Sequence, residues 1–159
     1  DTIIAGMSIT AERDEVIDFT QDYFPPSPSV YMGLSGSDID LDGGVIAAQT
    51  ATIQAGYVAE SGATLVEFAS AEETISAVQN GEADAVLADG DYLLPIIAES
   101  NGEFAAMGEV SIGGGVGMGI RESDGDLKAK MDKAISSMKD DGSLNALIKK
   151  WFGAEANTF

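Results

Sequence analysis

The feature that most constrains the fold is an alternation of short, apolar, β-rich runs with helical patterns through the middle of this 159-residue chain. Three runs read as buried strands, at Val45–Gln49, Thr64–Phe68 and Ala83–Ala88, and helical spacing follows each of them. This alternation predicts crossover connections and a mostly parallel sheet covered by helices on both faces. Ligands meet such sheets at the carboxyl ends of strands, which makes Gln49–Thr52 and Asp89–Asp91 candidate ligand positions.

The helices between these runs carry their own start and stop signals. A helix over Thr52–Glu60 ends at a Ser-Gly pair, and a helix over Ser70–Gln79 opens with a Ser-x-x-Glu capping box and ends at Asn-Gly. A further helix begins at Asp89, and Pro95 is expected to kink or delay it. Phe104–Val110 reads as the last strand of this unit.

The two ends of the chain have a different character and are expected to form a second body. Before the central unit come a strand-like run, Ile3–Met7, and a helical turn at Ala11–Val16. After it come two helices, Asp126–Met138 and Ser143–Phe152, separated by an Asp-Asp-Gly break. With one clear strand and two or three helices, this body is predicted to be incomplete.

We therefore predict an α/β chain of two lobes joined by a two-strand hinge. Its crossings are expected near 30–35 and 115–120, in an apolar run and a glycine-rich stretch. The complete, doubly wound lobe comprises residues 32–117, and the remainder of the other lobe comprises residues 1–31 and 118–159.

The net charge of −19 is distributed unevenly along the chain. Residues 35–120 carry fourteen acidic residues and no base, whereas residues 121–159 carry seven of each. Such a field repels nucleic acid and anionic lipid, so neither is an expected partner. Solubility is the favoured explanation of the charge. The more specific alternative is that the charge attracts a cationic ligand.

Several function classes are excluded by residue types that the chain lacks. It has no cysteine and no histidine, so a disulfide framework, a thiolate nucleophile, Ser-His-Asp catalysis and the usual zinc ligands are excluded. No apolar run is long enough to cross a bilayer, and no signal-peptide pattern is visible at the start. We predict no cofactor, no metal site and no catalytic residue.

Two motifs that resemble ligand loops have simpler explanations. The stretch GGGVGMG, residues 113–119, lacks the lysine and the glycine spacing of nucleotide loops, which favours a flexible crossing strand. Asp38–Gly44, DIDLDGG, has the alternating acids of a calcium loop, but Gln49 stands where an EF-hand has its closing glutamate. A surface turn is therefore favoured over an ion site.

Arg13 is the only basic residue before Arg121 and is a candidate ligand residue. A surface ion pair with Glu12, Asp14 or a residue one turn away is the simple explanation. The alternative is that its planar guanidinium holds a carboxylate inside an otherwise repulsive field. A second anion contact is available at Thr52, where a helix begins. For Asp89 two roles remain open, which are capping its helix and binding a ligand.

The segments DTIIAGMSITAERDEVIDFT, GGVIAAQTAT, NGEADAVLADGDYLL and GVGMGIRESDGDLKAKMDKAISSMKDDGSLNALIKKWFG occur here in that order. In this combination they resemble the periplasmic amino-acid-binding proteins of ABC transporters, the family 3 extracellular solute-binding proteins. The resemblance covers essentially the whole chain. It implies the periplasmic-binding-protein-like, type II (Venus-flytrap) fold, and a periplasmic protein that binds a polar L-amino acid between two lobes and delivers it to an ABC-transporter membrane permease.

The resemblance also implies roles for individual residues. Arg13 matches the arginine that clamps the α-carboxylate of the ligand, and Gly6 matches a backbone N–H donor to the same group. Ser8 matches a hydroxyl that contacts the α-ammonium, and Asp89 matches the acid that takes it. Thr52 matches the helix-start residue that meets the carboxylate from the other lobe.

The chain departs from the family pattern in two places. Family members have a strand–helix–strand segment before the match to Thr2, so we expect a fragment, an oligomer formed by swapping or by a complementing N-terminal fragment, or altered binding. Ala88 stands where relatives often carry a polar residue, which leaves the side-chain specificity open.

Three other functions compete with amino-acid delivery. An enzyme is one, because the resemblance extends to cyclohexadienyl (prephenate) dehydratases. A sensor domain is another, although no transmembrane helix follows the final segment, WFGAEANTF. The third is a fragment that does not bind ligand and takes part only in interactions.

Overall fold

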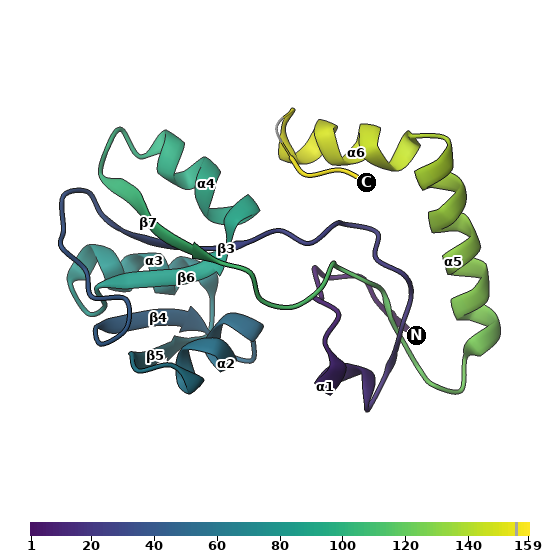
Figure 1. Ribbon diagram of the computed structural model, residues 1–159, viewed down its shortest axis with the longest axis horizontal. Helices are drawn as coiled ribbons and strands as arrows, with labels where there is room; N and C mark the ends of the chain where they lie inside the picture. The colour runs from purple at the N-terminus through teal and green to yellow at the C-terminus, as the bar shows by residue number, and fades with distance from the viewer. Residues whose placement is uncertain (155) are drawn as a thin grey trace. The chain divides into compact units, whose positions relative to one another are not determined.

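The computed structural model describes residues 1–154 and 156–159 (Figure 1). The chain divides into two compact units, which we call unit 1, residues 1–26 and 113–159, and unit 2, residues 27–112. Both boundaries lie five residues earlier in the chain than the lobe boundaries expected from the sequence. Among the described residues, no helix is long and apolar enough to cross a membrane.

Unit 2 is built on a five-stranded sheet with the strand order β5-β4-β6-β3-β7. Strand β4 runs parallel to β5 and β6, but β3 runs antiparallel to β6 and β7. The sheet is therefore mixed, and the prediction of a mostly parallel sheet was wrong. The strands are β3 (Ser29–Leu34), β4 (Val45–Gln49), β5 (Thr64–Phe68), β6 (Ala85–Asp89) and β7 (Phe104–Val110).

The apolar run near residues 30–35, which was expected to be a hinge crossing, was misinterpreted. In the structure it is β3, an interior strand with hydrogen-bonded neighbours on both sides. Five of its six residues are buried, as an interior strand covered on both faces requires. The apolar run signalled burial correctly, but it contains nothing that specifies the direction of the chain.

The helices of unit 2 are α2 (Ile53–Glu60), α3 (Ala71–Asn80) and α4 (Gly90–Glu99). The Ser70–Glu73 capping box at the start of α3 is confirmed, and Gly81 ends the helix with a left-handed φ of 74°. Pro95 lies inside α4, which already begins at Gly90, so it does not delay the helix.

Alternation along the strands gives unit 2 a core on both faces of its sheet. On one face, Met32 and Val86 pack with Val78 of α3 and Leu93 of α4. On the other face, Tyr31, Ile46 and Leu87 pack with Val58 of α2. Neighbouring strand residues thus serve opposite layers, and the three helices are fixed against the sheet by apolar burial.

Unit 1 has a much smaller sheet, in which each strand has two residues and the order is β1-β8-β2. Both pairings are antiparallel. The strand predicted over Ile3–Met7 is shorter than expected, because Gly6 adopts a φ of +65° that extended pairing does not accept. The elements are β1 (Thr2–Ile3), α1 (Ala11–Asp14), β2 (Asp18–Phe19), β8 (Gly119–Ile120), α5 (Gly125–Asp140) and α6 (Ser143–Phe152).

Side chains from distant parts of the sequence hold unit 1 together. Phe24 packs with Ile135 of α5 and with Leu144 and Ile148 of α6. Lys139 Nζ lies 2.7 Å from a carboxylate oxygen of Asp22. Gln21 adds hydrogen bonds to α5 through the side chain and carbonyl of Asp132 and the hydroxyl of Ser136.

Candidate functional site

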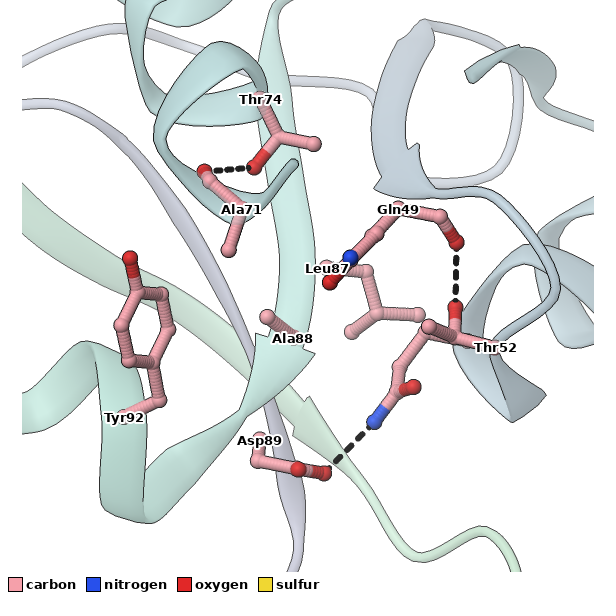
Figure 2. A pocket seen from close by; sticks show the side chains of 9 residues that line it. Gln49, Thr52, Ala71, Thr74, Leu87, Ala88, Asp89 and Tyr92 are labelled. Carbon is pink, nitrogen blue, oxygen red and sulfur yellow. Dashed lines mark hydrogen bonds between the residues drawn. The ribbon is translucent and has the colours of Figure 1, made fainter. Parts of the chain in front are cut away.

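A pocket of about 280 Å³ lies in unit 2, where β4 and β6 end and α2, α3 and α4 begin (Figure 2). Gln49 is the last residue of β4 and Asp89 the last of β6, so both side chains stand at the carboxyl edge of the sheet. Leu87 and Ala88 form an apolar part of the pocket wall. The polar side chains on the pocket are those of Gln49, Thr52, Gln54, Thr74, Asp89 and Tyr92.

Thr52 lies at the start of α2 and acts as its N-cap. Its hydroxyl accepts a hydrogen bond from the Ala55 N–H at 3.1 Å and donates one to the Gln49 carbonyl at 2.7 Å. Ala51 just before it has a φ of 61°, an uncommon conformation for a residue with a Cβ. The positive end of the α2 dipole is therefore presented at the pocket, where it favours a negatively charged group.

Asp89 occupies the N-cap position of α4, but its side chain makes no capping hydrogen bond. One carboxylate oxygen instead accepts a hydrogen bond of 2.7 Å from Gln54 Nε2, drawn as a dashed line in Figure 2. The capping alternative for Asp89 is thus wrong as regards its side chain. The carboxylate is turned toward α2 and the pocket.

The environment of Asp89 acts on its charge in opposing ways. Asp89 is an exposed residue, but partial desolvation of its carboxyl group by the surrounding protein raises the pKa of that group, the hydrogen bond from Gln54 lowers it, and the nearby charge of Asp91 raises it. The net effect is a pKa above the usual value for aspartate. A cation bound beside Asp89 would oppose this shift, since it favours the ionised carboxylate.

The remaining candidates, Gly6, Ser8 and Arg13, lie in unit 1. Arg13 belongs to the single-turn helix α1, whose N-cap Thr10 accepts a hydrogen bond from the Arg13 N–H. The half-buried guanidinium donates through Nη1 to the Ser8 carbonyl at 3.0 Å. Burial raises the pKa of the Tyr23 phenol, and a backbone hydrogen bond with Gly6 offsets part of this rise.

The structure thus groups the predicted residues into two sets. Ser8 and Arg13 are in direct contact in unit 1, and Thr52 and Asp89 line one pocket in unit 2. Gly6 precedes the first set on an exposed loop. The acidic stretch over Asp38–Gly44 forms a turn in which the Asp40 carboxylate accepts a hydrogen bond from the Asp42 N–H.

Sequence reasoning missed Gln54, whose side chain is 5 % exposed and bonds to both Ser29 and Asp89. A signal was available, because Gln54 lies four residues before the buried Val58 and so falls on the apolar face of its helix. A glutamine on a buried face needs hydrogen-bond partners. Those partners lie 25 and 35 residues away in the chain, and the local pattern does not identify them.

The chain is similar to known solute-binding proteins. The sequence model of the bacterial extracellular solute-binding proteins, family 3, matches residues 1–154. A similar solved structure is a periplasmic His/Glu/Gln/Arg/opine family-binding protein from Silicibacter pomeroyi in complex with lysine, with 68 % identity and a TM-score of 0.94, covering all of this chain and 72 % of that one. An ancestral arginine-binding protein bound to arginine is 28 % identical with a TM-score of 0.86, over 96 % of this chain and 72 % of the other.

Curated proteins of two bacteria are also similar to this chain. The putative ABC transporter arginine-binding protein 2 of Escherichia coli K12 is 26 % identical over 96 % of this chain and 66 % of its own length. The ABC transporter glutamine-binding protein GlnH of Bacillus subtilis 168 is 26 % identical over 95 % of this chain and 57 % of its own. The chain thus spans 57–66 % of the length of these two relatives.

The solved relatives are periplasmic amino-acid-binding proteins with the type II fold, which confirms the predicted fold class. The family match extends over nearly the entire sequence, as the resemblance of its motifs indicated. The chain belongs to the bacterial extracellular solute-binding proteins, family 3.

Proposed function

We propose that this chain binds a polar L-amino acid and that the whole protein delivers it, in the periplasm, to the membrane permease of an ABC transporter. The observation that carries the proposal is the pairing, on one pocket, of the Asp89 carboxylate with the N-terminus of α2 at Thr52. A zwitterion has one cationic and one anionic group a few ångströms apart, and it needs a partner for each. The family match supports the same function.

We assign the charged groups of the ligand as the family resemblance implies. Asp89, with the hydroxyl of Ser8, receives the α-ammonium group. Arg13, with the N–H of Gly6 and the helix start at Thr52, receives the α-carboxylate. Charge-assisted hydrogen bonds of this kind are shorter and stronger than neutral ones. Arg13 suits its role because the planar guanidinium forms two parallel bonds to a carboxylate.

We further propose that the side chain of the ligand is cationic, as in lysine or arginine. Unit 2 carries fourteen acidic residues and no basic residue, so its field attracts a ligand with net positive charge and repels acidic amino acids. Among the relatives, one with 68 % identity was solved with lysine, and others are named as arginine-binding proteins.

The test is a thermal-shift and calorimetric panel of the twenty common L-amino acids with this chain, with prephenate added as the substrate of the enzyme alternative. A ligand at about a hundred times its Kd stabilises the fold by roughly 2.7 kcal/mol, which raises the melting temperature visibly. We expect lysine or arginine to give the largest shift and glutamate and aspartate none. No shift with any amino acid, or consumption of prephenate, would overturn the proposal.

A further inference from the structure

A hydrogen-bonded chain of three polar side chains lies in unit 2, and two of them, Gln54 and Asp89, line the pocket. Gln54 Nε2 donates to the Ser29 hydroxyl at 3.0 Å and to the Asp89 carboxylate at 2.7 Å, so both protons of one amide nitrogen are engaged. Ser29 is 1 % exposed and Gln54 is 5 % exposed. Asp89, at the pocket end of the chain, is an exposed residue, so two of the three members are buried.

The fold brings these three residues together from three different elements. Ser29, at the start of β3, lies directly opposite Asp89, at the end of β6, in the antiparallel register of the two strands. Gln54 comes from the first turn of α2, on the same helix face as Val58, which is packed against the sheet. The amide therefore bridges two paired strand ends, and its position is set by packing on both sides.

We propose that Gln54 is the positioning residue of this site, which holds the Asp89 carboxylate in the orientation that receives the α-ammonium group of an amino acid. The proposal rests on the proposed function. Two observations carry it. Asp89 stands at an N-cap position without capping the helix, so its orientation has another cause, and the 2.7 Å bond from Gln54 supplies that cause. Ser29 fixes Gln54 in turn.

The charges near Asp89 oppose its ionisation. On its own helix, Asp91 is a like charge that disfavours ionisation of Asp89, and burial acts in the same direction. Burial raises the pKa of Tyr92 on the same helix, and the charge of Glu72 on α3, a helix that also lines the pocket, raises it further, so this neighbourhood is acidic too. Neither β3 nor the first turn of α2 carries a charged residue. Among the causes that act on the pKa of Asp89, the hydrogen bond from Gln54 is the one that lowers it.

The test compares native protein with Gln54→Met, which keeps the length of the side chain and removes its donors. Carbon-detected NMR of the Asp89 carboxyl group, in the absence of ligand, gives its protonation midpoint, and calorimetry with L-lysine and L-arginine from pH 4 to 8 gives Kd. Without this donor the Asp89 carboxylate is no longer held toward the ligand, so we expect binding to weaken about tenfold at neutral pH. We expect the midpoint of Asp89 to move to higher pH and the loss of binding on acidification to begin at higher pH.

The matched control is Gln49→Met, because Gln49 also lines the pocket but donates to the Ala69 carbonyl. We expect it to leave the Asp89 midpoint at the native value. If Gln54→Met does not fold, Ser29→Ala gives the same test, since it removes one of the two contacts that fix the amide. It is expected to move the midpoint in the same direction by a smaller amount.

The outcomes separate the two proposals. An Asp89 midpoint that is the same in native protein, Gln54→Met and Ser29→Ala would overturn the positioning role. A raised midpoint together with a shifted pH profile of binding would support it. If the midpoint rises but native protein binds no amino acid at any pH, the influence of Gln54 on Asp89 stands and the proposed function is overturned.

Discussion

The two units of the molecule hold their candidate site residues on very different supports. Unit 2 presents Thr52 and Asp89 at the edge of a five-stranded sheet with a core on each face. Unit 1 presents Gly6, Ser8 and Arg13 on a loop and a four-residue helix beside strands of two residues. Among the described residues, sixteen buried apolar side chains belong to unit 2 and six to unit 1.

The exposed apolar side chains have the opposite distribution. In the part of the chain that the structure describes, seven of the ten large hydrophobic residues that are exposed lie in unit 1, among them Ile4 at 59 %, Val16 at 72 % and Trp151 at 71 %. Local stability follows buried apolar contacts, so unit 2 is the more stable support and unit 1 the less stable one. Arg13 and Asp89, which we propose to bind the carboxylate and the ammonium group of the ligand, are therefore held with different rigidity.

The largest expected effect comes from the same substitution in the two cores. Leu87→Ala in unit 2, where Leu87 is 1 % exposed, should lower the free energy of unfolding by about 3–5 kcal/mol. Leu144→Ala in unit 1, where Leu144 is 8 % exposed, should cost about 2–3 kcal/mol because the site relaxes more easily. Urea unfolding followed by circular dichroism measures both. Equal losses of unfolding free energy, or a larger loss for Leu144→Ala, would contradict the conclusion that unit 2 is more stable than unit 1.

The next largest effect is that of Arg13→Ala on binding. Removing the guanidinium should raise the Kd for lysine or arginine about a hundredfold, or roughly 2.7 kcal/mol, because the ligand carboxylate loses its cation. The free energy of unfolding should change by less than about 1 kcal/mol. The matched control is Arg121→Ala, whose guanidinium pairs with the exposed Asp1 in the same unit. If the two variants bind equally well, the assignment of Arg13 is wrong.

Asp89→Asn should separate binding from stability. Its Kd should rise about tenfold or more, since the ammonium loses its counter-charge. Stability should not fall, because the Asp89 side chain makes no capping bond and burial raises its pKa. A raised folded-state pKa means that the native protein loses stability as pH rises from the usual aspartate value through the folded value. The Asp89→Asn variant has no carboxyl group at this position to ionise. Its free energy of unfolding, relative to that of native protein, should therefore be higher at pH 7 than at pH 3, as measured by urea unfolding.

The smallest effect concerns backbone strain beside the pocket. Ala51 has a φ of 61°, where a Cβ is unfavourable, so Ala51→Gly should stabilise the fold by roughly 0.5–1 kcal/mol. Asn101, also in unit 2, has a φ of 54°, but asparagine tolerates this conformation, so Asn101→Gly should gain less. Melting temperatures of the two variants rank the gains. A loss of stability in Ala51→Gly would mean that the alanine methyl group makes contacts worth more than the strain.

Local signals explain which elements the sequence predicts well. Strands β4, β5 and β7 and helix α6 have the predicted bounds, because apolar runs and breaks such as Asp-Asp-Gly delimit them. The capping box at Ser70 is likewise a contact over three residues. Strand β3 was misinterpreted because its partners, β6 and β7, lie more than fifty residues further along the chain.

The site follows the same rule. Residues at strand ends and helix starts, such as Thr52 and Asp89, are found from local pattern, and both line the pocket. The bond between Gln54 and Asp89 joins residues 35 positions apart, and no local pattern contains it. The lack of a side-chain cap at Asp89 was equally hidden, since an aspartate before a helix normally predicts one.

The lack of any basic residue in unit 2 has a practical consequence for experiments on this chain. Trypsin cleaves after lysine and arginine, and none stands between Arg13 and Arg121, so residues 14–121 stay in one peptide even after complete digestion. Every tryptic site lies in unit 1. Limited trypsin digestion therefore reports on the opening of unit 1 alone, whereas a protease that cleaves after glutamate attacks both units and gives the comparison in a single digest.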